Sequence, residues 1–84
     1  MEQENNMQTV LVVEDEPDMI LGLKDNLEYE GYRVDIASDG ETGLEQASSG
    51  RPDLILLDVM LPKMSGLDVC RKLRTQGADM PIIM

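Results

Sequence analysis

The chain has little of the material from which disulfides and thiolate or imidazole metal sites are built. Its 84 residues include one cysteine and no histidine. A disulfide within the chain is therefore excluded, and zinc, which binds mainly through cysteine and histidine, is not expected. A metal site in this chain would have to be built from oxygen ligands.

Positive charge and long apolar runs are also scarce. Seven basic residues stand against 17 acidic ones, which gives a formal net charge of −10 and argues against a nucleic-acid or anionic-membrane surface in this segment. No apolar stretch is long enough to cross a bilayer, and the amino terminus lacks the basic start and apolar run of a secretory signal. We therefore expect one small cytoplasmic domain, with residues 1–8 as a flexible tail and residues 9–84 folded.

The apolar residues that are present gather in short runs that predict strands. Residues 54–57 read LILL between two nearby prolines, which favours a strand buried on both faces over a helix. Residues 9–13 read TVLVV and predict a second buried strand. Alternating residues at 32–36 predict a strand with one wetter face, at an edge of the sheet, and residues 80–84 begin a fourth strand.

Helix signals separate these strands. Pro17, capped by Glu16, begins the first helix, and Gly31 ends it in a left-handed conformation. Residues 41–49 form a second, short helix, and Ser65 caps a third. The side chains expected to face the core from the helices are Met19, Ile20, Leu23, Leu27, Leu44, Ala47, Leu67, Cys70 and Leu73. The order βαβαβαβ predicts an α/β fold with a parallel sheet and right-handed crossovers.

Two of the predicted strands end on carboxylates. Glu14 and Asp15 follow the first strand, and Asp58 follows LILL. If these strands are neighbours in a parallel sheet, the acids meet at the edge where open α/β sheets bind ligands. Two carboxylates about 5 Å apart repel by roughly 3 kcal/mol at an effective dielectric of 20, a cost that a bound divalent cation or a retained proton would offset. An oxygen-only site of this kind suits Mg²⁺ or Mn²⁺.

Helix capping gives another explanation for some of the acids. Glu16 and Asp18 lie where the first helix begins, and acids there are favoured by capping and by the helix dipole. Glu14 precedes the cap, and Asp58 has no helix start beside it, so capping accounts for these two less well. Two acid-tipped strands in one small domain favour a shared site.

Taken together, these segments resemble the receiver domain of two-component response regulators. The matching pieces are VLVVEDEP (10–17), GYRV (31–34), ASDGETGL (37–44), PDLILLDVMLPKMSGLDVCRKLR (52–74) and MPII (80–83). The resemblance implies a flavodoxin-like, doubly wound parallel sheet with strand order 2-1-3-4. A complete receiver has a fifth strand and two more helices, so the resemblance implies a receiver truncated after the fourth strand.

The resemblance also implies roles for individual residues. Asp58 is similar to the aspartate that accepts a phosphoryl group from a sensor histidine kinase, and it would also contact the metal. Asp15 resembles the direct Mg²⁺ ligand, Glu14 the second acid, which usually acts through a bound water, and Met60 the residue whose backbone carbonyl faces the metal. The domain would then be a signalling module whose only catalysis is its own phosphoryl transfer, rather than an enzyme.

In the family, a serine or threonine after the fourth strand and a lysine after the fifth also contact the phosphoryl group. The sequence ends at Met84, before either position, and Lys24 and Lys63 are not expected to replace that lysine. We therefore expect a fragment that keeps the acceptor and the metal ligands but is impaired in switching.

Two other functions stay open at this point. A phosphatase with Asp58 as nucleophile would need a second acid two residues later, where Met60 stands. A receiver-like interaction module that is never phosphorylated would be expected to lack the acceptor or the acid pair, and both are present. We further expect the exposed fourth strand to allow self-association, and we expect a DNA-binding output domain in the full-length protein.

Overall fold

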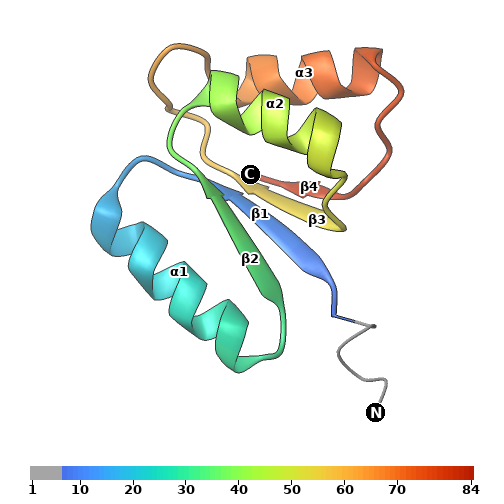
Figure 1. The fold of residues 1–84 in the computed structure, drawn as a ribbon. Helices are drawn as coiled ribbons and strands as arrows, with labels where there is room; N and C mark the ends of the chain where they lie inside the picture. The colour runs from blue at the N-terminus through green and yellow to red at the C-terminus, as the bar shows by residue number, and fades with distance from the viewer. Residues whose placement is uncertain (1–6) are drawn as a thin grey trace.

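In the part of the chain that the structure describes, three helices alternate with four strands (Figure 1). The computed structural model describes residues 7–84, so most of the predicted tail, residues 1–6, lies outside the described residues. The elements are β1 (Thr9–Val13), α1 (Pro17–Tyr29), β2 (Arg33–Ala37), α2 (Gly40–Gly50), β3 (Leu54–Leu57), α3 (Gly66–Thr75) and β4 (Ile82–Ile83). This is the predicted βαβαβαβ order.

The four strands form one parallel sheet in the order β2-β1-β3-β4. β1 lies inside the sheet, where Val13 pairs with Ala37 of β2 and with Leu57 of β3. Because crossovers between parallel strands share one hand, the helices fall on both faces of such a sheet. α1 covers one face, and α2 and α3 cover the other (Figure 1). The predicted doubly wound α/β fold with order 2-1-3-4 is confirmed.

The main core lies between the sheet and the pair α2 and α3. Its buried apolar residues come from β1, β2, β3, α2 and α3, and they are Leu11, Val13, Ala37, Ala47, Ile55, Leu57, Val69 and Leu73. β1 and β3 contribute alternate residues because successive side chains of a strand point to opposite faces. Burying one such leucine or valine side chain stabilises the fold by roughly 1.5–3 kcal/mol.

The buried side of α3 is offset from the predicted one. Gly66, Val69 and Leu73 are buried, whereas Leu67, which we expected to face the core, is 48% exposed. Leu67 lies two residues before Val69, which is roughly 200° around a helix, so the two side chains cannot face the same side. The predicted inward positions of Leu73 and Cys70 hold, since Leu73 is fully buried and Cys70 packs against the core.

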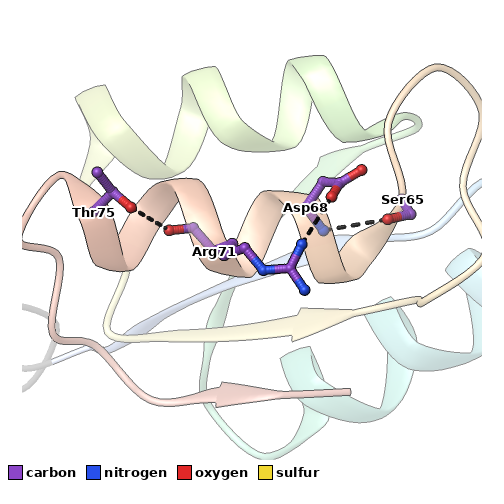
Figure 2. Close-up of polar contacts among 4 residues, drawn as sticks. All are labelled: Ser65, Asp68, Arg71 and Thr75. Carbon is purple, nitrogen blue, oxygen red and sulfur yellow. Dashed lines mark hydrogen bonds and ion pairs between the residues drawn. The ribbon is translucent and has the colours of Figure 1, made fainter.

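Polar contacts line the outward side of α3 (Figure 2). The hydroxyl of Ser65 accepts a hydrogen bond from the Asp68 backbone N–H at 3.2 Å, which confirms the predicted cap. Arg71 donates from Nη1 to Asp68 Oδ1 at 3.3 Å, and Thr75 Oγ1 donates to the Arg71 carbonyl at 3.0 Å. The Ser65 cap fixes where α3 begins and therefore where the loop after β3 ends.

α1 begins and ends where the sequence predicts. Glu16 Oε1 accepts a hydrogen bond from the Met19 N–H at 2.9 Å, and Pro17 occupies the first helical position. Gly31 follows the last turn with a φ of 97°, a left-handed conformation that glycine adopts without strain. No helix among residues 7–84 is long and apolar enough to cross a membrane.

α1 nevertheless buries none of its residues. Ile20, Leu23 and Leu27 face the sheet and are only half-buried. Met19, which we expected in the core, is 52% exposed. It lies on the flank of the narrow stripe that these three side chains form, about 100° around the helix from Ile20.

Candidate functional site

β1 and β3 end at the same level of the sheet, and the hydrogen bonding between them continues one residue past the end of β3. Val13 pairs with Leu57, and the Asp58 N–H donates to the Val13 carbonyl at 3.0 Å. On the other side of β1, the Glu14 N–H donates to the Ala37 carbonyl at 3.0 Å. Glu14 and Asp58 therefore leave the sheet as neighbours at its carboxyl edge.

The carboxylates of Glu14, Asp15 and Asp58 converge at this edge. Each offers one oxygen, and the three oxygens lie within 4.8 Å of one another. Glu14 and Asp58 are half-buried, and Asp15 is exposed. Three like charges at this spacing repel, although water and salt screen the exposed member. The structure thus brings together the three acids that the strand ends single out.

Backbone N–H groups hold two of these carboxylates in place. Glu14 Oε2 accepts a hydrogen bond from the Glu16 N–H at 3.2 Å. Asp58 Oδ1 accepts one from the Met60 N–H at 3.3 Å. The Met60 side chain is 81% exposed, so its backbone is the part of this residue that is tied to the site.

The donor set fits a hard divalent cation. The three converging groups are all carboxylates, and neither a thiol nor an imidazole belongs to the cluster. Oxygen-only sites with few carboxylates are typical of Mg²⁺, which dehydrates reluctantly and keeps several waters. A cation there would also neutralise the repulsion among the three acids.

Residues 59–65, which we call the site loop, lead from Asp58 to α3. The Gly66 N–H donates to the Val59 carbonyl at 2.8 Å. A Cβ on Gly66 would lie 2.2 Å from the Asp58 carbonyl oxygen, so any other residue would force the two backbones apart. The first turn of α3 therefore rests directly on the backbone of Asp58 and braces it.

Lys24 and Lys63, which are not expected to replace the family's phosphoryl-binding lysine, both form ion pairs outside the three-acid cluster. Lys24 Nζ lies 3.0 Å from Glu28 Oε2, one turn along α1. Lys63 Nζ lies 3.9 Å from Asp39 Oδ2, across the gap between the site loop and α2. Neither acid partner belongs to the three-acid cluster.

Asp39 is a residue near the site that the sequence did not single out. Its Oδ1 accepts a hydrogen bond from the Thr42 N–H at 2.7 Å, and its Oδ2 accepts one from the Thr42 hydroxyl at 3.2 Å. The Thr42 N–H is the main cause that lowers the pKa of Asp39; burial opposes it, and the Thr42 hydroxyl and Lys63 assist it. The available signal was the Asp39-Gly40 pair, which lies between β2 and the predicted second helix.

A shallow groove of about 270 Å³ adjoins the acids on the α1 side of the sheet. Leu23, Leu56 and Ile83 contribute apolar walls, and Glu14 and Asp58 lie at one end. The groove is lined from β1, α1, β3 and β4 and from the residues that follow β1 and β3, so no local pattern in the sequence could have predicted it.

Comparison with known sequences identifies the family. The family model for the response regulator receiver domain matches residues 10–84. The alkaline phosphatase synthesis transcriptional regulatory protein PhoP of Bacillus subtilis (strain 168) is 52% identical over 75 residues, which are 89% of this chain and 31% of that protein. Response regulator MprA of Mycobacterium ulcerans (strain Agy99) is 45% identical over 75 residues, 89% of this chain and 32% of that protein. The chain thus spans about a third of the length of these relatives.

Solved structures show the same fold. Response regulator TrrA of Thermotoga maritima, in complex with Mg²⁺ and BeF, superimposes with a TM-score of 0.88 at 42% identity, over 93% of this chain and 68% of that chain. The receiver domain of a sensor histidine kinase from Pseudomonas aeruginosa PAO1, with a magnesium ion coordinated in the active-site cleft, gives 0.87 at 35% identity, over 90% and 64%. With a sheet of this order, acids at its carboxyl edge and a family match over residues 10–84, the chain belongs to the receiver-domain family of two-component response regulators.

Proposed function

We propose that this chain is a phosphoacceptor module in which Asp58 takes a phosphoryl group from a sensor histidine kinase. The observation that carries the proposal is the convergence of three carboxylate oxygens within 4.8 Å at the end of β1 and β3. Membership of the receiver family supports it. A carboxylate that attacks an anionic phosphoryl group meets strong repulsion, so the reaction needs a positive charge at the same place.

Under this proposal the positive charge is Mg²⁺, with Mn²⁺ as the alternative ion. Asp15 and Asp58 would hold the ion directly, Glu14 through a water, and Met60 through its backbone carbonyl. The Mg²⁺ described in the TrrA complex and in the P. aeruginosa receiver domain supports this choice. When bound, the ion offsets the negative charge that the incoming phosphoryl group adds to the three acids.

In the proposed transfer, an oxygen of Asp58 forms a bond to phosphorus as the bond between phosphorus and the donor imidazole nitrogen breaks. The departing imidazole takes up a proton from solvent, and the product is an acyl phosphate. The chain's contribution is alignment, because the ladder bond to Val13 and the contact with Gly66 fix the backbone of Asp58. Such a module is a signalling domain whose chemistry is limited to its own modification.

The partners follow from the same proposal. The donor is a sensor histidine kinase, the folded receiver unit is residues 9–84, and the compartment is the cytoplasm. The printed name of PhoP, a transcriptional regulatory protein, supports a DNA-binding output domain in the longer form of the protein. We also propose weak self-association through β4, an edge strand of this sheet, because Ile83 and Met84 are each 55% exposed.

Intact mass spectrometry after incubation with a small-molecule phosphodonor and Mg²⁺ tests the proposal. We expect one added phosphoryl group, which does not form when the metal is chelated before the phosphodonor is added and is absent in Asp58→Asn. Asp79→Asn is the matched control, because Asp79 is an exposed aspartate before β4 and should keep the modification. Steady release of phosphate without lasting modification would instead indicate a phosphatase. No modification of the unaltered chain would sink the proposal and favour an interaction module.

A further inference from the structure

The first turn of α2 touches the site loop at three points. The Gly40 N–H donates to the Pro62 carbonyl at 3.4 Å. Asp39 Oδ2 lies 3.9 Å from Lys63 Nζ. A Cβ on Gly40 would lie 2.1 Å from the Met64 carbonyl oxygen and 2.8 Å from Met64 Cβ. Only glycine at position 40 lets the backbone of α2 approach the backbone of Met64 this closely. The contact is therefore between two backbones and does not depend on flexible side chains.

α2 is the fixed partner in this contact. Ala47 is buried in the main core with 1% of its surface exposed. Gly43 is also buried, and a Cβ there would lie 2.8 Å from Cγ1 of Val13, so the helix already rests on β1. The bond from the Thr42 N–H to Asp39 fixes the cap residue against the first turn. A side chain added at the start of α2 would therefore displace the loop and not the helix.

The middle of the site loop depends on such outside support. Its ends are held by the bond between Gly66 and Val59 and by the Ser65 cap, and Leu61 and Met64 pack against the main core. Within the loop, the Met64 N–H donates to the Pro62 carbonyl at 2.7 Å. Between the ends of the loop, Pro62 and Lys63 are exposed, and Lys63 has a φ of 71°, a left-handed conformation that is unfavourable for a residue with a side chain. A strained, exposed segment keeps one conformation only where neighbouring elements hold it.

We propose that Gly40 and Asp39 are positioning residues through which the first turn of α2 holds the site loop, and with it the Met60 backbone, in the place that the metal site requires. The inference rests on the proposed function, because that proposal assigns the Met60 carbonyl to the metal. Neither residue belongs to the three-acid cluster. Their effect is exerted through the loop, and a misplacement of about 1 Å at a site of this kind can cost on the order of 100-fold in activity.

Gly40→Ala tests the backbone contact, with Gly50→Ala as its matched control. Gly50 lies at the other end of the same helix, and a Cβ there would meet no atom within 4 Å. We expect Gly40→Ala to shift the amide NMR signals of residues 59–65 in metal-free protein and to weaken Mg²⁺ binding by about tenfold or more, while Gly50→Ala changes neither. Unchanged loop signals in a folded Gly40→Ala, or an equal loss in Gly50→Ala, would overturn the inference.

The ion pair between Asp39 and Lys63 gives a second test, in which the substitutions do not enlarge the side chains. This test still applies if Gly40→Ala does not fold. Asp39→Asn keeps the cap, since asparagine caps as well as aspartate, and Lys63→Gln removes the other charge. Each change should weaken Mg²⁺ binding about twofold, and the double variant should lose no more than either single one, because the two residues share one interaction. If the loss of Mg²⁺ affinity in the double variant equals the combined losses of the two single variants, the inference is overturned.

The two readouts separate this inference from the proposed function. If the unaltered chain binds no Mg²⁺ in the NMR titration, the proposed metal site fails, and the metal-free loop signals of the Gly40→Ala variant still test the contact. If Mg²⁺ binds but the loop signals of that variant match those of the unaltered chain, the positioning role fails and the metal site stands.

Discussion

The two faces of the sheet differ in how they are covered. On the side of α2 and α3, buried side chains from strands and helices form a continuous cluster in which Ile55 and Leu73 are fully shielded from solvent. On the side of α1, the helix buries none of its residues, and Leu54 and Leu56 of β3 are only half-buried. β3 therefore presents one face to a packed core and the other to a thinly covered surface (Figure 1).

The two faces contribute differently to the stability of the domain and to the geometry of the site. The face under α2 and α3 supplies most of the buried apolar contacts, and the same two helices touch the backbone of Asp58 and the site loop. The α1 face contributes the turn with Glu14 and Asp15 and a groove that ends at the acids. Stability and site geometry are therefore closely coupled on the first face, whereas on the α1 face the buried strand residues are Val10 and Val12 of β1.

The largest expected difference between the two faces is in the effect of removing a leucine that faces the sheet from each side. Leu73→Ala in α3 removes a fully buried side chain and should lower the free energy of unfolding by about 2–5 kcal/mol. Leu23→Ala in α1 removes a half-buried side chain and should cost about 1 kcal/mol.

Urea denaturation followed by circular dichroism measures both variants. A loss of the expected size would be a large fraction of the total, because small domains have only about 5–15 kcal/mol of stability. Equal losses in the two variants would show that α1 is packed as well as α3, and the comparison between the faces would fail.

The strands and caps could be predicted because their signals are local. TVLVV and LILL are short apolar runs between turn residues, and they form β1 and β3 with the predicted bounds. Glu16, Pro17 and Ser65 act within one helical turn, so their roles follow from neighbours in the sequence.

The buried side of a helix is a tertiary property, and here the sequence predictions partly failed. Leu67 and Val69 are both apolar residues of α3, and the choice between them depends on where the sheet lies. Met19 is an apolar residue on the flank of α1, and the width of the strip that touches the sheet leaves it half exposed. Periodicity alone cannot fix that width.

The meeting of the acids could be predicted because strand ends share an edge in a parallel sheet. Glu14, Asp15 and Asp58 come together for that reason alone, and their chemical roles stay proposals. The contact between Gly40 and Met64 has no such rule behind it. It joins backbone atoms 24 positions apart, and an Asp-Gly pair in a sequence signals a turn far more often than a close approach.

A smaller effect of opposite sign is expected on the thinly covered face. Gly22 lies within α1, and a Cβ there would meet no atom within 4 Å. Gly22→Ala should therefore raise the free energy of unfolding by about 0.5–1 kcal/mol, because alanine loses less backbone entropy in a helix than glycine does.

Differential scanning calorimetry should show this gain as a rise in Tm of a few degrees. Gly31→Ala is the informative control, because it has equal open space but a φ of 97°, so it should lower Tm. A fall in Tm for Gly22→Ala would mean that α1 packs more closely than its exposure indicates.

The smallest expected effect concerns the start of α2, on the well-packed face, and it is present at neutral pH and disappears at acid pH. The Thr42 N–H, as the main cause, lowers the pKa of Asp39, so the ionised carboxylate stabilises the fold at neutral pH. That contribution is present above the ordinary aspartate pKa and is lost as the pH falls through the lowered folded value, below about pH 4. Asp39→Asn keeps a capping group but does not titrate.

The difference in unfolding free energy between the unaltered chain and Asp39→Asn should therefore shrink as the pH falls from 7 towards about 3. Urea denaturation at a series of pH values measures this difference. Glu45→Gln, on the exposed side of the same helix, removes one negative charge without removing a cap, so it controls for the change in net charge. A difference that stays constant over this range would mean that the charge of Asp39 does not stabilise α2, and the cap would then act through its hydrogen-bond geometry alone.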